Sequence, residues 1–224
     1  MRILITAGGT REYIDPVRFI TNASSGKMGY ALALAALKAG HKVTLITTRS
    51  WMLDAGYSTR IENRESRIKI VKVDSAAQMF DAVKKHFPKC DCLIMAAAVA
   101  DYTPIRPAKT KIKRKNTSLT IKLKPTVDIL KWAGEHKNEG RGTRDERRIV
   151  VGFALEEKNL RELAEKKLNE KKLDMIIANT PAAIGSDKST VHLKTSDAPW
   201  TKIEEATKTT IAKMIIHVVE NLSR

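Results

Sequence analysis

The chain is poor in cysteine and in aromatic side chains: it has two cysteines in 224 residues, and only 5% of its residues are Phe, Trp or Tyr. Two thiols cannot by themselves complete a tetrahedral zinc site, so we expect Cys90 and Cys92 to be reduced cysteines, with no protein-held metal. Few aromatic rings are available to stack on bases, which disfavours single-stranded nucleic acid as a partner.

Long apolar runs and a leader segment are also missing. No run approaches the ~18 apolar residues of a membrane span. The chain enters a predicted strand at residues 3–6 without the charged and then apolar pattern of a signal peptide. We therefore expect a cytoplasmic protein that makes no contact with a membrane.

Acidic residues are outnumbered, with 25 against 41 basic ones, and the formal net charge is +16. Nucleic acid, small polyanionic substrates and a lysine-rich proteome would each account for this excess. The basic residues are spread along the chain with acids among them, which disfavours nucleic acid. The other two explanations remain open.

Short apolar runs alternate with helical patterns along the chain. The predicted strands cover residues 3–6, 43–47, 68–73, 92–98, 149–154 and 175–178. The predicted helices cover residues 30–39, 76–86, 128–136, 159–171 and 203–222. This alternation is typical of an α/β fold with a mostly parallel sheet covered by helices on both faces. In such sheets ligands bind beyond the carboxyl ends of the strands.

Residues 22–29, which we call the anion loop, read Asn-Ala-Ser-Ser-Gly-Lys-Met-Gly and lead into an apolar helix. Free backbone N–H groups and the helix dipole favour negative charge at such a position. Glycine lets a phosphate or carboxylate approach the backbone closely. The loop is therefore a candidate anion site.

The spacing of the anion loop excludes two common phosphate loops. Thr21 and Met28 occupy the positions where a Walker loop has Gly and Ser or Thr, and residues 7–12 lack the dinucleotide fingerprint. A simpler interpretation is that Ser24 or Ser25 caps the helix. That interpretation leaves most of the loop unexplained.

Residues 96–101 close a strand with small side chains and then a carboxylate. Small side chains at a strand end let a flat ring lie against the backbone, although tight packing of a helix on the sheet needs the same residues. Asp101 is suited to hold a ribose hydroxyl or a metal-bound water. Taken alone, it is more often a helix cap.

Residues 102–124, which we call the flap, leave the sheet pattern. Residues 119–123 alternate apolar and polar side chains, and residues 109–115 are rich in lysine. This pattern predicts an antiparallel edge hairpin with a basic tip. Such a tip is either a solvated surface or a flexible flap that closes on a triphosphate. Lys167 and Lys171 share a helix face.

Several catalytic motifs are missing. No tyrosine is followed by lysine four residues later, and there is no Gly-x-Ser-x-Gly elbow. The second strand ends at Thr47-Thr48-Arg49, without the acid that holds an NAD ribose. Two rival interpretations are an NADP-dependent reductase with Arg49 near a 2′-phosphate and a nucleic-acid binder that uses the flap.

The sequence resembles the phosphopantothenoylcysteine synthetases, also called phosphopantothenate–cysteine ligases, of coenzyme A biosynthesis. The match runs in order over nearly the whole chain. The residues that carry it are 6–12, 14–18, 22–29, 96–102, 111–113, 151–156 and 173–179. In most bacteria this ligase is one half of a fusion with a flavin-dependent decarboxylase. This chain starts at the first strand of the ligase, so it resembles the stand-alone form and is expected to need no flavin.

The resemblance implies a single Rossmann-like ligase domain over residues 1–224 that forms a homodimer. It implies that the carboxylate of 4′-phosphopantothenate attacks CTP to give an acyl-cytidylate and pyrophosphate. The amine of L-cysteine then displaces CMP. Mg²⁺ is expected to bridge the nucleotide phosphates with few protein ligands. ATP, which eukaryotic relatives use, is the less favoured nucleotide.

The resemblance also assigns residues. The nucleotide is expected to contact Met95, Ala96, Ala97, Asp101, Lys111, Val127, Asp128, Ile129, Leu130, Phe153, Lys167 and Lys171. Phosphopantothenate is expected to contact Asn22, Ser24, Ser25, Gly26, Lys27 and Gly29. Asn22 and Lys111 are the candidate catalytic residues.

Three positions depart from the family pattern. Val127 replaces a proline in the nucleotide pocket, and Glu157 replaces a threonine. Ile184 stands where the family usually has phenylalanine. These changes bear on the choice between CTP and ATP.

Overall fold

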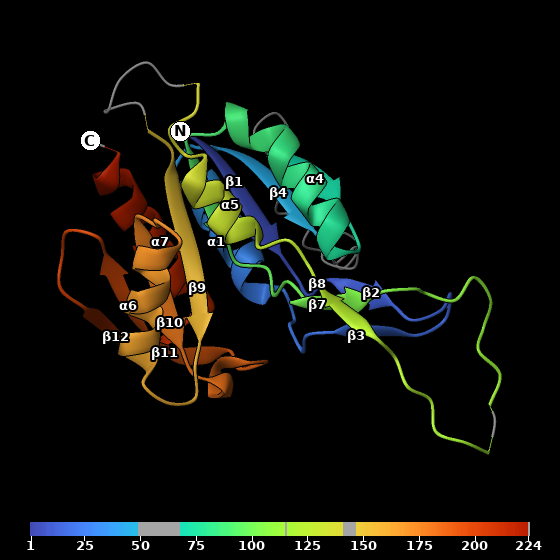
Figure 1. The fold of residues 1–224 in the computed structure, drawn as a ribbon. Helices are drawn as coiled ribbons and strands as arrows, with labels where there is room; N and C mark the ends of the chain where they lie inside the picture. The colour runs from blue at the N-terminus through green and yellow to red at the C-terminus, as the bar shows by residue number, and fades with distance from the viewer. Residues whose placement is uncertain (49–67, 115, 141–146, 224) are drawn as a thin grey trace.

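The computed structural model describes residues 1–48, 68–114, 116–140 and 147–223 (Figure 1). The expected role of Arg49 and the middle of the polar 138–148 loop lie outside these residues. One eight-stranded sheet, in the order β12-β11-β10-β9-β6-β1-β4-β5, forms the centre of the fold. Its strands are β1 (Arg2–Ala7), β4 (Lys42–Thr47), β5 (Ile68–Lys72), β6 (Cys92–Met95), β9 (Ile149–Leu155), β10 (Met175–Asn179), β11 (Lys188–Thr195) and β12 (Thr201–Thr207).

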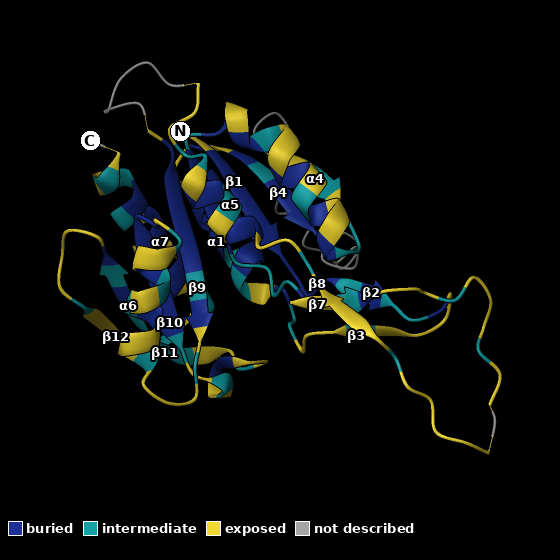
Figure 2. Cartoon of the chain, viewed as in Figure 1, coloured by how far each residue is buried: buried dark blue, intermediate teal, exposed yellow. Residues whose placement is uncertain are grey.

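Helices cover both faces of this sheet, as the alternating pattern predicts. They are α1 (Lys27–Lys38), α4 (Ala76–His86), α5 (Ile129–Glu135), α6 (Leu160–Glu170) and α7 (Lys208–Leu222), with short 3₁₀ turns η2 (Phe87–Lys89) and η4 (Pro181–Ala183). Helices α1 and α7 pack together on one face, and α4, α5 and α6 contribute to a second core on the other face. Figure 2 shows the strands between these layers as the most buried part of the chain.

The order of the six parallel strands fixes where a ligand site belongs. From β1 the chain runs outward through β4 to β5, and then returns to the other side of β1 with β6, β9 and β10. The direction of winding therefore reverses between β1 and β6. In doubly wound sheets the crevice beyond the carboxyl ends of the strands at this reversal is the usual ligand site. The Rossmann-like α/β fold expected from the sequence is confirmed.

Two small antiparallel sheets lie beside the main one. Strands β2 (Arg11–Tyr13) and β3 (Phe19–Thr21) form a hairpin, which we call the arm. Strands β7 (Tyr102–Pro104) and β8 (Leu123–Pro125) pair at the base of the flap. Figure 1 shows the arm and the flap projecting together from the body, at the end opposite the two chain termini.

The structure corrects several predicted boundaries. The predicted helix at residues 203–222 is wrong at its start, because residues 201–207 form β12, which pairs with β11 and buries Ile203. Thr207 then caps α7 by accepting the Thr210 N–H. The predicted strand at 92–98 ends at Met95. Residues 119–122 are not a strand, and the flap forms its own two-stranded sheet instead of an edge of the main one.

Gly29 explains how closely α1 approaches the end of β1. A Cβ added at Gly29 would lie 2.6 Å from the Ala7 Cβ and 2.9 Å from the Thr6 carbonyl oxygen. These contacts are too short for any real side chain, and the Thr6 carbonyl belongs to the backbone of a central strand. The glycine is therefore required by helix–strand packing.

We expect Gly29→Ala to lower the free energy of unfolding by about 1–3 kcal/mol, the range found when an extra carbon is forced into a packed core. Urea unfolding followed by circular dichroism measures the change. Lys38→Ala, at an exposed position of the same helix, is the control and is expected to shift stability by less than about 0.5 kcal/mol. Equal stabilities for Gly29→Ala and wild type would contradict this account of the packing.

Candidate functional site

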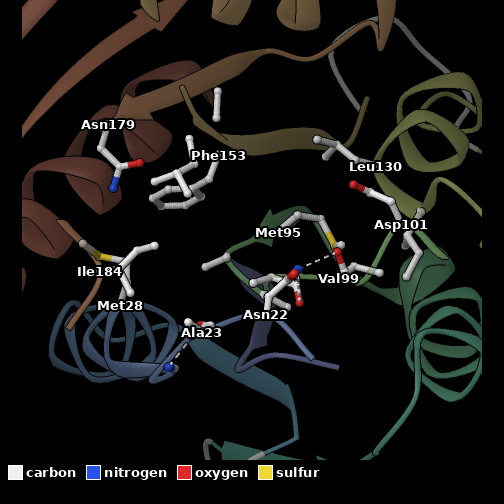
Figure 3. A pocket seen from close by; sticks show the side chains of 18 of the residues that line it. Asn22, Ala23, Met28, Met95, Val99, Asp101, Leu130, Phe153, Asn179 and Ile184 are labelled. Atoms are coloured by element: carbon white, nitrogen blue, oxygen red, sulfur yellow. Dashed lines mark hydrogen bonds between the residues drawn. The ribbon is translucent and has the colours of Figure 1, made fainter. Parts of the chain in front are cut away.

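A pocket of about 870 Å³ lies beyond the carboxyl ends of the parallel strands (Figure 3). The anion loop, the end of β6, the residues before and at the start of α5, the end of β9 and one face of α6 all line it. The residues expected from the sequence that line it are Asn22, Ser24, Ser25, Gly26, Lys27, Met95, Ala96, Ala97, Asp101, Val127, Asp128, Ile129, Leu130, Phe153, Lys167 and Lys171. Two expected residues, Gly29 and Lys111, are not part of this lining.

Two buried threonine hydroxyls hold the segment after β6 in place. Thr6 Oγ1 accepts the Ala97 N–H at 3.2 Å, and Thr10 Oγ1 accepts the Ala100 N–H at 2.9 Å. Backbone pairing continues beside them, since the Ala98 N–H donates to the Gly8 carbonyl at 2.9 Å. These bonds replace sheet pairing where β6 has ended. The alanine-rich segment therefore forms a fixed wall of the pocket.

Asn22 joins the anion loop to this wall. Its Nδ2 donates to the Val99 carbonyl at 3.1 Å and to the Ala98 carbonyl at 3.3 Å. Figure 3 shows the side chain between the loop and the strand end, at the floor of the pocket. A charged carboxylate at this position would face two carbonyl oxygens without a proton to donate. An amide is therefore the side chain that this position needs.

The anion loop approaches α1 through a left-handed turn at Gly26, whose φ is 76°. Gly26 is itself the N-cap residue, and no side chain caps the helix. The Ser24 and Ser25 hydroxyls accept the N–H groups of Gly26 and Lys27, each at a long 3.4 Å. The simpler interpretation, in which a serine caps the helix, is therefore wrong. Both serines bend the loop along the pocket.

Lys167 of α6 and Lys171, the residue after the end of α6, line another wall of the pocket. The Lys167 ammonium donates to the Phe153 carbonyl at 2.8 Å, and the Lys171 ammonium lies 2.7 Å from the Asp128 carboxylate. Burial, and then the charge of Lys171, lowers the pKa of Lys167. Burial alone would raise the pKa of Asp128, but the bonds from Lys171 and from the Lys131 N–H outweigh it and the pKa is lowered.

Lys111 lies on the flap, away from the pocket, and the arm fixes the chain next to it. The buried Asp15 carboxylate accepts the Ile112 N–H at 3.1 Å and pairs with Arg18. Arg18 Nη2 in turn donates to the Ile112 carbonyl at 2.9 Å. Both backbone groups of Ile112 are thus held by one ion pair. The flap is therefore anchored to the arm at this point.

Other pocket residues escaped the sequence reasoning. Lys208 is the clearest example, because the predicted helix at 203–222 placed it inside a helix, whereas it begins α7 after a strand. No local motif marks it. The remaining lining residues, many of which lie within the motifs that carry the family resemblance or, like Ile184, were noted as departures from it, are Ala23, Met28, Ala98, Val99, Tyr102, Pro125, Thr126, Ala154, Leu155, Glu156, Asn179, Ala183, Ile184 and Gly185.

Within the described part of the chain, no helix is long and apolar enough to cross a membrane. The same residues contain no cluster of three or more His, Cys, Asp or Glu side chains that could hold a metal ion. Cys90 and Cys92 are buried and form no disulfide, and burial raises the pKa of Cys92 well above its ordinary value.

The strand order, with a basic pocket at its point of reversal, defines a Rossmann-like α/β domain with a candidate ligand site at the switch point. More particularly, the chain belongs to the family described as the DNA/pantothenate metabolism flavoprotein C-terminal domain, which matches residues 1–222. This confirms the family resemblance noted in the sequence.

Named relatives agree with this assignment. The chain is 38% identical over 226 residues to the coenzyme A biosynthesis bifunctional protein CoaBC of Bacillus subtilis (strain 168), covering 99% of this chain and 52% of the relative. It therefore spans about half the length of the curated relatives it matches. The crystal structure of the C-terminal domain of a CoaBC protein is 36% identical, with a TM-score of 0.75, over 99% of this chain and 94% of that one. The DNA/pantothenate metabolism flavoprotein of Streptococcus pneumoniae is 25% identical, with a TM-score of 0.79, over 99% of each chain.

We expect Asp15→Asn to release the flap without unfolding the body, because Arg18 loses its carboxylate and the bonds to Ile112 weaken together. Amide hydrogen exchange at Ile112 and its neighbours is expected to accelerate at least about tenfold, while exchange in β1 and β6 stays slow. Asp74→Asn, which removes the partner of Arg11 in the arm without touching the flap, is the control. Unchanged exchange at Ile112 would show that the ion pair does not anchor the flap.

Proposed function

We propose that residues 1–224 form a single, cytoplasmic phosphopantothenate–cysteine ligase domain, with residues 102–124 as its flap. In the proposed reaction the carboxylate of 4′-phosphopantothenate attacks the α-phosphorus of CTP and expels pyrophosphate. The amine of L-cysteine then attacks the acyl carbon and expels CMP. The observation that carries the proposal is the family match over residues 1–222, together with 38% identity to half of a coenzyme A biosynthesis protein.

The pocket geometry supports this reaction class. The proposed chemistry joins two bound substrates through an activated carboxylate, so it needs positioning and charge stabilisation and no protein nucleophile. The alanine-rich wall at residues 96–98 suits a flat base and ribose, with Asp101 next to it. Lys167 and Lys171 line another wall of the pocket, where they suit the triphosphate. No flavin takes part in the proposed steps.

Mg²⁺ is proposed to arrive with the nucleotide. The described pocket has carboxylates at Asp101, Asp128 and Glu156, and Asp128 is already paired with Lys171. This donor set does not fit an ion held by the protein alone, but it fits one held mainly by phosphate oxygens. Such an ion would neutralise charge on the phosphates during displacement.

A homodimer is also part of the proposal. The arm and the flap expose several large apolar side chains: Val17, Phe19, Tyr102, Ile105, Leu119 and Leu123. Exposed apolar patches of this kind favour a protein partner, and the resemblance names a second copy of this chain. A dimer would also bring a second flap into the assembly, with its own Lys111.

The direct test is pyrophosphate release by the purified protein with Mg²⁺, 4′-phosphopantothenate and either CTP or ATP. We expect release with CTP that requires phosphopantothenate, with CMP and the amide product appearing only when cysteine is added. A preference for ATP would keep the ligase and revise the nucleotide. No release with either nucleotide would contradict the proposed function.

Lys111→Gln is expected to lower turnover by roughly 10²-fold, the scale of losing one positioned donor to developing charge. Lys111 is proposed to reach the nucleotide phosphates within the homodimer, which brings a second flap into the assembly. Lys122→Gln, an exposed lysine of the same flap, is the matched control and is expected to stay within about twofold of wild type. Turnover of Lys111→Gln within a few-fold of the control would remove Lys111 from the mechanism.

A further inference from the structure

Three charged side chains meet at the end of the pocket that lies away from Asp101. The Lys27 ammonium, from the anion loop, is 2.9 Å from the Asp187 carboxylate. Lys208, the first residue of α7, lines the same pocket. Figure 3 shows Met28 and Ile184 at this end and Asp101 and Leu130 at the other. The pocket therefore has a second cationic end, separate from the pair Lys167 and Lys171.

The loop before β11, which contains Ala183 and Asp187, makes two hydrogen bonds with Lys208. The Lys208 backbone N–H donates to the Asp187 carbonyl at 3.3 Å, and its ammonium donates to the Ala183 carbonyl at 3.3 Å. Between these contacts Gly185 turns the chain with φ of 75°. The side chain is partly buried, and no carboxylate within the described residues lies within 4 Å of its ammonium. A backbone carbonyl oxygen carries only a partial negative charge, so the Ala183 carbonyl does not neutralise the Lys208 ammonium.

At this end the ammoniums of Lys27 and Lys208 lie near the Asp187 carboxylate, and within the described residues only Lys27 forms an ion pair with it. Burial, and then Lys27, lowers the pKa of Lys208, whereas Asp187 acts in the opposite direction. A phosphate monoester carries a charge near −2 at neutral pH and has three acceptor oxygens. Such a group matches the two ammoniums better than one carboxylate does.

A phosphate that binds Lys27 would have to displace Asp187 from a weak, exposed ion pair. The Asp187 side chain is 87% exposed and that of Lys27 is 44% exposed. Exposed ion pairs of this kind typically contribute little to stability. Asp187 can therefore leave Lys27 at small cost when a stronger anion arrives, and the loop that carries it can stay attached through Lys208.

We propose that Lys208 and Lys27 together bind a phosphate group of one of the two anionic substrates, and that Asp187 competes with that phosphate for Lys27. This inference rests on the proposed function for the identity of the substrates. It adds Lys208 as a binding residue and Asp187 as an internal competitor. The phosphate belongs either to 4′-phosphopantothenate or to the nucleotide, and the two sources can be distinguished by titrating each ligand alone.

The test is calorimetric titration of the full chain with CTP and, separately, with 4′-phosphopantothenate, so that no readout depends on turnover. Lys208→Met is expected to weaken binding of one of these ligands by about tenfold, the effect of losing one charged contact. The weakened ligand identifies the source of the phosphate. Lys213→Met, an exposed lysine of the same helix, is the matched control and is expected to leave both affinities unchanged.

Asp187→Asn separates competition from a structural role. Removal of the competing charge is expected to tighten binding of the same ligand by a few-fold, whereas loss of a loop-holding contact would weaken it. Lys208→Arg, which keeps the charge, is expected to retain most of the affinity, and melting temperatures show whether each variant is folded.

Two results would overturn the inference. One is wild-type affinity of Lys208→Met for both ligands, which leaves the proposed function intact. The other is weaker binding by Asp187→Asn. If the wild-type protein binds neither ligand, the proposed function and this inference fail together.

Discussion

The pocket depends on how the chain leaves β6. At that point regular strand pairing ends, and the hydroxyls of Thr6 and Thr10 accept the Ala97 and Ala100 N–H groups while Ala98 still pairs with the backbone after β1. Asn22 closes the arrangement by donating to carbonyls of the same segment. A buried N–H without a partner costs about 1–3 kcal/mol, so these bonds decide whether the segment stays open beside the sheet or collapses onto it. The small alanine side chains then leave room for a ligand.

The pocket is also lined by lysine ammoniums that are held by neighbouring groups. The cations come from both ends of the pocket, and each is restrained by a neighbour: Lys167 by the Phe153 carbonyl, Lys171 by Asp128 and Lys27 by Asp187. Restrained cations cost less to order when an anion binds, because their rotamers are already selected. The proposed reaction uses two polyanionic substrates and no protein nucleophile. The excess of basic residues in the sequence is consistent with this use of charge.

Much of this arrangement could be predicted from the sequence. The helix at residues 76–86 has the predicted bounds, because Ser75 and Gln78 form a capping box that marks its start. The anion loop, the alanine-rich strand end and the pair Lys167 and Lys171 also meet in one pocket. In a parallel sheet the carboxyl ends of the strands share one edge, so motifs at several strand ends converge even when they are far apart in sequence.

What could not be predicted depends on contacts between distant residues. The periodicity of residues 203–222 does not indicate that residues 203–207 pair with β11. The sequence therefore predicted Lys208 to lie within a helix, whereas it is the first residue of α7. Gly29 looked like part of an anion site, yet its place against Ala7 and the Thr6 carbonyl is enough to require glycine. Lys111 was expected at the pocket, but the Asp15–Arg18 pair holds the neighbouring Ile112 on the arm.

In the proposed reaction this pocket activates a carboxylate by transferring the nucleotidyl group of CTP to it. The most direct measurement supplies 4′-phosphopantothenate labelled with ¹⁸O in its carboxylate and follows the label by mass spectrometry after turnover with CTP and cysteine. We expect one ¹⁸O atom in the released CMP, because the carboxylate oxygen that attacks the α-phosphorus leaves with it. Unlabelled CMP, or the label in inorganic phosphate, would contradict it.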